Sequence, residues 1–230
     1  QIGLYKHKPG VFIEHGCEAT HNDYVRGKFK SLGISQDKFG WTSIQLDGGI
    51  DAVLNKIVKY FSKKVEETYD LNFVNTGLGS LKIGLQNDGP LNNYTSKILS
   101  EVCKLIVSFG GTIVIPENSD LISNKTFAKN TFKTNNNDNP VTLGYAEKID
   151  LGTKPGLHIM KNPTNHWVET TVGLGATGVD MILANVENHS MQGNPMLPMI
   201  QISSCDTISK NDIDFLIDPR KNENISCMIK

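Results

Sequence analysis

Short apolar runs alternate along the chain with longer stretches in which apolar residues recur every three or four positions. The short runs predict β-strands at 11–14, 41–46, 81–85, 112–115, 157–160, 179–184 and 199–202. The longer stretches predict helices at about 20–32, 50–63, 94–109 and 166–178. This alternation predicts an α/β fold with a Rossmann-like, mostly parallel sheet and helices on both faces.

Turn signals and a polar break set the predicted boundaries. Gly33 and the Gly110-Gly111 pair end two of the expected helices, and Asp47-Gly48-Gly49 precedes another. From 117 to 148 the periodicity weakens, and the Asn-rich run at about 133–140 is predicted to be an exposed loop. We expect a single α/β domain over 1–230, the carboxyl-terminal part of a longer protein. The Asn-rich loop could instead divide the chain into two lobes, and one continuous sheet is equally compatible with the pattern.

Charge and motif content exclude several classes of function. The chain has 23 basic and 24 acidic residues without a long basic run, so we expect no binding to nucleic acid or to an anionic membrane surface. No apolar stretch approaches the roughly 20 residues of a membrane span. Neither a G-x-G-x-x-G fingerprint nor a P-loop occurs, so no nucleotide cofactor is expected. The four cysteines are far apart and lack zinc spacing, which favours a reduced, cytoplasmic setting.

The densest group of chemically active side chains follows the first predicted strand. In open α/β sheets, ligands bind at the carboxyl ends of strands, and this loop leads directly into a predicted helix. Cys17 is a candidate nucleophile or soft metal ligand, and His21 with Asp23 could act as a base and its orienting group or as metal ligands. Capping of the helix by Thr20 or Asn22 is the simpler alternative for this polarity. The predicted catalytic residues are Cys17, Glu18, His21 and Asp23, and the predicted metal ligands are Cys17 and His21.

Polar residues also follow the other predicted strands. If all strands share one parallel sheet, their carboxyl ends meet at one edge and favour a hydrophilic, hydroxyl-rich small molecule. The loops at 116–118 and 161–166 belong to this group. Asp47 with its two glycines also has a structural explanation, as a helix cap and tight turn. The predicted substrate-binding residues are His15, Asn22, Arg26, Gln45, Asp47, Asn87, Asp88, Asn185, Asn188 and His189.

Several segments, taken together, resemble one family of enzymes. They are Val11-Phe12-Ile13-Glu14-His15-Gly16-Cys17-Glu18, Gln45 with the helix after it, Ile83-Gly84-Leu85, Gly110-Gly111-Thr112-Ile113-Val114, Pro116-Glu117, Lys154-Pro155-Gly156-Leu157, Leu197-Pro198-Met199-Ile200-Gln201-Ile202 and Ile213-Asp214-Phe215. In order and spacing they are similar to the carboxyl-terminal part of the altronate and galactarate dehydratase family. The resemblance covers most of the chain through short motifs.

That resemblance implies a Rossmann-like domain of a hydro-lyase that removes water from a sugar acid with a divalent metal, usually Fe²⁺. The metal would stabilise the enolate formed when the proton α to the carboxylate is removed. The family's amino-terminal domains are expected partners that supply part of the site, so this chain alone is expected to be inactive. A homo-oligomer is a further expectation.

Two loops depart from the family pattern. After 83–85 the family has Cys-Gly-Gly-Ser-Asp, whereas this chain has Gln86-Asn87-Asp88-Gly89-Pro90. Before Leu197 the family has a Thr-Gly-Arg-Gly-Thr loop, whereas this chain has an acid, Glu187. Because Glu repels a carboxylate that Arg would bind, an uncharged or cationic ligand, a metal-bridged acid and lost activity all stay open. The two rival interpretations are a related sulfolactate sulfo-lyase-like carbon–sulfur lyase and a non-catalytic structural or assembly domain.

Overall fold

The computed structural model describes residues 10–66, 77–132, 139–150, 152–205, 207–208 and 212–218. It divides into two compact units, one within Tyr5–Val74 and the other within Asn75–Lys230. The division lies well before the Asn-rich loop, most of which (133–138) falls outside the described residues. That residues 1–230 form a single α/β domain stays a prediction.

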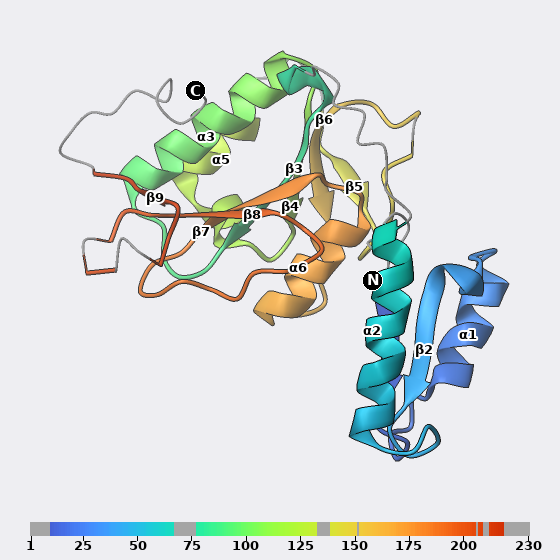
Figure 1. Ribbon diagram of the computed structural model, residues 1–230. Coiled ribbons are helices and arrows are strands. Elements are labelled where there is room, and N and C mark those ends of the chain that lie inside the picture. Colours follow the sequence, from blue (N-terminus) through green and yellow to red (C-terminus); the bar gives the residue numbers. More distant parts are fainter. Residues whose placement is uncertain are drawn as a thin grey trace. The chain divides into compact units, whose positions relative to one another are not determined.

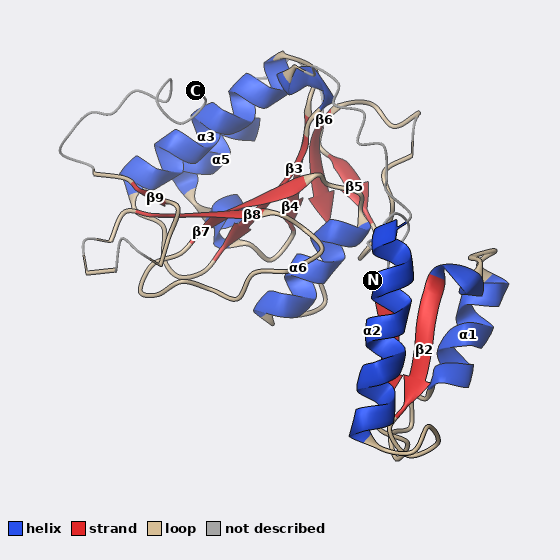
Figure 2. Cartoon of the chain, viewed as in Figure 1, coloured by secondary structure: helices blue, strands red, loops and turns tan. Residues whose placement is uncertain are grey.

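The smaller unit is built on two parallel strands flanked by helices (Figures 1 and 2). β1 pairs in parallel with β2, so that Glu14 lies opposite Ser43 at their carboxyl ends. Phe12, Phe29, Phe39 and Trp41 pack on one another, with the Phe12 and Trp41 rings stacked at 4.6 Å between centroids. The elements are β1 (Gly10–Glu14), α1 (Asn22–Ser31), the 3₁₀ turn η1 (Gln36–Lys38), β2 (Phe39–Ser43) and α2 (Ile50–Glu66).

In the part of the chain that the structure describes, the larger unit holds a parallel sheet of seven strands in the order β5-β6-β4-β3-β7-β8-β9 (Figures 1 and 2). Its first strand, β3, lies in the middle between β4 and β7, which is the strand order of a doubly wound fold. The elements are η2 (Leu78–Ser80), β3 (Lys82–Asn87), α3 (Asn93–Ser108), β4 (Thr112–Pro116), α4 (Asp120–Ser123), α5 (Lys125–Phe132), β5 (Val141–Leu143), β6 (Gly156–Met160), α6 (Trp167–Ala176), β7 (Met181–Asn185), β8 (Met199–Ser203) and β9 (Phe215–Leu216).

Alternate residues of the central strands supply two cores, one on each face of the sheet. Ile113 and Ile115 of β4 pack with α3 and with Phe127 of α5. Val114, between them in sequence, packs on the other face with Leu174 of α6. All of these side chains are fully buried. The predicted α/β fold with a parallel sheet and helices on both faces is therefore confirmed.

Every predicted strand and helix is present, with ends shifted by a few residues. We considered one sheet in which all strand ends meet at a single edge, but the first two strands belong to a second sheet. β1 and β2 form their own sheet, because the aromatic cluster of Phe12, Phe29, Phe39 and Trp41 gives them a separate core. The polar ends of β1 and β2 therefore lie at a different sheet from those of β3, β4, β6 and β7. Within the described residues, no helix is long and apolar enough to cross a membrane.

Candidate functional site

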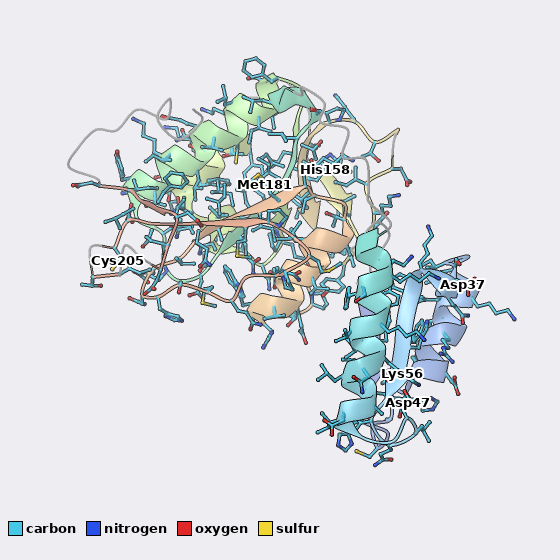
Figure 3. All side chains as sticks on the ribbon, viewed as in Figure 1. Asp37, Asp47, Lys56, His158, Met181 and Cys205 are labelled. Carbon is cyan, nitrogen blue, oxygen red and sulfur yellow. The ribbon has the colours of Figure 1, made fainter. Side chains whose placement is uncertain are left out.

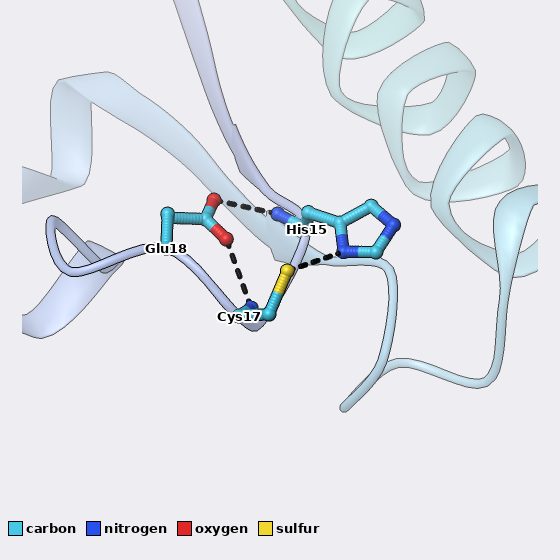
Figure 4. Close-up of side chains that lie close together, drawn as sticks. All are labelled: His15, Cys17 and Glu18. Atoms are coloured by element: carbon cyan, nitrogen blue, oxygen red, sulfur yellow. Dashed lines mark hydrogen bonds between the residues drawn. The ribbon is translucent and has the colours of Figure 1, made fainter.

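The loop after β1 wraps around the carboxylate of Glu18. Glu18 Oε1 accepts a hydrogen bond from the backbone N–H of His15 at 2.7 Å, and Oε2 accepts those of Gly16 at 2.8 Å and Cys17 at 3.0 Å (Figure 4). Hydrogen bonds from the backbone N–H groups of Glu18 itself, His15 and Gly16 favour the ionised form and lower the pKa of Glu18 to about 2. The carboxylate thus holds the loop and stays ionised at neutral pH.

This fold of the loop brings a thiol and an imidazole together. His15 Nδ1 lies 3.2 Å from Cys17 Sγ (Figure 4). His15, Cys17 and Glu18 are all exposed, and each offers one ligand atom within 4.8 Å of the others. The sequence placed Cys17 with His21, whereas the structure places it beside His15.

The spacing of these atoms fits a metal ion. An ion about 2.1 Å from a histidine nitrogen and about 2.3 Å from a thiolate sulfur would see two atoms 3.2 Å apart at roughly 90°. The pair therefore lies close enough for one divalent ion to contact both atoms. Glu18 offers a carboxylate oxygen within 4.8 Å of the other two ligand atoms as a third potential metal ligand. The described residues thus supply three potential ligands to one divalent ion.

Two partly buried polar contacts hold this loop against the sheet. Glu14, only 8% exposed, accepts a hydrogen bond from the backbone N–H of Asn22 through Oε2. The side-chain amide of Asn22 donates to the carbonyl oxygen of Thr42 on β2 at 2.9 Å. Asn22, predicted to bind substrate, therefore also joins the start of α1 to the end of the neighbouring strand.

Asp47 connects the turn after β2 to α2. Its Oδ2 accepts from Thr42 Oγ1 at 2.6 Å and from the backbone N–H of Ser43 at 2.9 Å. Its Oδ1 lies 2.5 Å from Lys56 Nζ, and Figure 3 shows the pair at the base of α2. The Lys56 ammonium, followed by Thr42 and Ser43, holds the pKa of Asp47 well below its usual range. The carboxylate is thus engaged in closing this turn.

The other residues predicted in this loop have separate surroundings. His21 immediately precedes α1, is exposed, and makes no side-chain capping bond. Asp23 lies 3.5 Å from Arg26, whose guanidinium stands 5.0 Å from the centre of the Trp41 ring. Gln45 lies against the loop, since a Cβ built on Gly16 would come within 2.6 Å of its Oε1.

In the larger unit, predicted site residues meet where β3 and β7 end. Asn185 Nδ2 donates to Asn87 Oδ1 at 2.8 Å, and the backbone N–H of Asp88 donates to the carbonyl of Asn185 at 2.9 Å. These strands adjoin at the point where the strand order reverses, the usual place for a ligand in such a sheet. Asn188 and His189 are exposed in the loop after β7.

The loop at 86–90 and the loop that carries Glu187 also meet here. A Cβ on Gly89, in the first of them, would come within 2.7 Å of Glu187 Oε2 in the second. The amide-rich segment 86–89 and Glu187 therefore lie next to each other in the folded chain. Sequence reasoning noted the polar loop at 161–166 but did not single out Asn162, which is 6% exposed and lines a pocket at this sheet edge.

Comparison with models of known protein families finds no match to this chain, and comparison with curated protein sequences also finds none.

Proposed function

We propose that this chain is part of a metal-dependent lyase of the hydro-lyase type, acting on a hydroxy acid of the sugar-acid class. The observation that carries the proposal is the pairing of His15 Nδ1 with Cys17 Sγ at 3.2 Å, in an exposed loop at the carboxyl end of a parallel strand. This pairing adds a geometric argument to the short motifs that the chain shares with sugar-acid dehydratases.

In this proposal His15 and Cys17 hold a divalent ion, with Fe²⁺ the expected metal, and Glu18 keeps their loop in shape. When bound, such an ion polarises the substrate carboxylate and assists the departing hydroxide. Glu18 is unsuited to removing the α-proton, because a carboxylate with a pKa of about 2 is a very weak base. His21 is the better candidate for that step, since its exposed ring makes no capping bond.

Anaerobic Fe²⁺ titration of the whole chain tests the metal site. We expect micromolar binding that is lost in Cys17→Ala and weakened at least about tenfold in His15→Ala, because each variant removes one of two strong donors. His21→Ala is the matched control, since it removes an exposed histidine from the same loop but outside the close group. Equal weakening by His15→Ala and His21→Ala would contradict the assigned ligand set.

Substrate class is tested with the Co²⁺-loaded chain, whose thiolate charge-transfer absorption reports directly on Cys17. Galactarate, which can chelate through an α-hydroxy carboxylate, should change this spectrum. Galactitol has the same carbon skeleton and inner hydroxyls but no carboxylate, so it should leave the spectrum unchanged. A metal-loaded protein that responds to neither compound, nor to other hydroxy acids, would favour the structural-domain alternative.

A further inference from the structure

A polar pocket of about 360 Å³ opens in the larger unit at the carboxyl ends of β3, β4 and β6. This volume lies at the small end of the roughly 300–1,000 Å³ typical of small-molecule sites. It is lined by residues from three separate stretches of the chain, among them Asp88, Asn118, Asn162 and Trp167. Such a position, outside strand ends of a doubly wound sheet, is where this architecture binds ligands.

The charge of the lining argues against an anion. Asp88 and Asp120 are its charged groups, and no Lys or Arg occurs among the described residues that line it. A phosphate or carboxylate would meet two negative charges without a cationic partner. Most of the remaining lining side chains are carboxamides and hydroxyls, so a purely apolar ligand would leave them unpaired.

The carboxamides are held in place by one another. Asn162 Nδ2 lies 2.8 Å from Asn118 Oδ1 and 3.0 Å from Thr170 Oγ1, and Asn118 Nδ2 donates to Asn165 Oδ1 at 2.7 Å. Trp167 Nε1 donates to the carbonyl of Gln192 at 2.8 Å, which restrains the indole ring. A lining that is already ordered loses little conformational entropy when a ligand binds.

Several lining groups keep unused hydrogen-bonding capacity of both kinds. Within the described residues, the carboxylates of Asp88 and Asp120 make no hydrogen bond or ion pair and can accept. The side-chain N–H₂ of Asn165 has no acceptor there and can donate. Asn162 Oδ1 is buried and without a hydrogen-bond donor in this part of the chain. Groups that accept and groups that donate are both satisfied by hydroxyls, which can do either.

We propose that this pocket binds an uncharged polyhydroxylated ligand, an alditol or aldose of monosaccharide size. Asp88 and Asp120 would accept hydrogen bonds from its hydroxyl groups, Asn165 would donate to one, and Trp167 would offer an aromatic surface to its C–H groups. The inference uses the larger unit alone and does not depend on the metal site or on lyase activity.

NMR titration of the ¹⁵N-labelled whole chain with galactitol, in the presence of EDTA, tests this inference. The two tryptophans of the chain give two indole N–H signals, one from each unit, and Trp167→Phe assigns them. We expect galactitol to shift the Trp167 signal and not the Trp41 signal, with a dissociation constant in the millimolar range, as befits a ligand of few atoms. Galactarate at the same concentrations should shift neither signal.

The double variant Asp88→Asn/Asp120→Asn should weaken galactitol binding at least about tenfold, since hydrogen bonds to charged acceptors are the stronger ones. Asp150→Asn, which changes an exposed acid of the same unit outside the pocket, should bind as the wild type does. A Trp167 response to galactarate but not to galactitol would overturn the inference, as would no response to either. The inference would also be overturned if, without EDTA, Ca²⁺ or Mg²⁺ alone shifted the Trp167 signal while galactitol did not. These ligand comparisons use the wild-type chain, with Trp167→Phe needed only to assign the two signals, so they decide the matter even if the double variant fails to fold.

Discussion

Three glycines of the smaller unit offer a graded test of how the Cys17 loop is held. Gly27 lies inside α1 with open space around its Cα, and Gly33 has a φ of +68° with open space around it. Gly16 combines a φ of +114° with close neighbours: a Cβ there would lie 2.6 Å from Gln45 Oε1 and 2.9 Å from Gln45 Cβ. Alanine at position 27 therefore adds no strain, and alanine at position 33 adds backbone strain alone. Alanine at position 16 adds both backbone strain and a steric clash.

The magnitudes follow from these differences. Gly27→Ala should stabilise the unit by about 0.5–1 kcal/mol, because alanine is the better residue inside a helix. Gly33→Ala should cost about 1 kcal/mol, since a left-handed penalty of about 1–2 kcal/mol is partly offset by a stiffer unfolded chain. Gly16→Ala should cost about 2–6 kcal/mol, from a rare backbone conformation and overpacking worth about 1–3 kcal/mol each. Rotating the Gln45 amide cannot relieve the clash, because the Cβ of Gln45 is also too close.

Urea unfolding followed by Trp41 fluorescence, in a Trp167→Phe background, measures this series in the smaller unit. Trp41 is a suitable probe because it stacks on Phe12 within the core of that unit. Fe²⁺ titration of the same variants should show weakened binding in Gly16→Ala and unchanged binding in Gly33→Ala. A Gly16→Ala variant no less stable than Gly33→Ala would refute the close approach of Gln45 to the loop.

Three further predictions concern pH and the core. The hydrogen bonds to the Glu18 carboxylate are fully present above its ordinary pKa of 4.5 and are lost as pH falls through the lowered pKa of about 2. The NMR signals of the Gly16 and Cys17 amides should therefore titrate near pH 2 and not near pH 4.5. Burial lowers the pKa of His158 from 6.5, so the unfolded chain binds more protons than the folded chain. The free energy of unfolding should therefore fall as pH drops below about 6.5, and it should fall less in His158→Gln. Thermal unfolding across pH 5–8 measures both. Phe127→Ala should destabilise the larger unit by about 3–5 kcal/mol in urea unfolding, since this side chain is fully buried, and a loss below about 1 kcal/mol would contradict its place in the core.

Much of the fold could be predicted because its elements have clear local patterns. The apolar face of α3 and the fully buried run of β4 need no tertiary information to be recognised. α5 (Lys125–Phe132) was not predicted, because its burial depends on Phe127 and Thr131 alone within a polar sequence. The separate sheet of β1 and β2 was also hidden, since strands have the same pattern whichever sheet they join.

The location of the candidate site could be predicted better than the residues that form it. The polar loop after β1 was evident from composition, but His15 and His21 are both near Cys17 in sequence. The positive φ of Gly16 and the hydrogen bonds of Glu18 bring His15 to Cys17, and neither can be read from residue spacing. The roles predicted for these residues stay predictions. Asn162 was not singled out because its importance comes from long-range contacts with Asn118, 44 positions away in sequence.

The short outer strands of the seven-stranded sheet bear on how the protein avoids aggregation. The sheet has β5, of three residues, at one edge and β9, of two residues, at the other. A long open edge presents unpaired N–H and C=O groups on which another chain can build a strand, and short edge strands limit the length of such pairing. Lengthening β9, where Phe215 is already 44% exposed, would therefore be expected to promote self-association even if the fold became more stable.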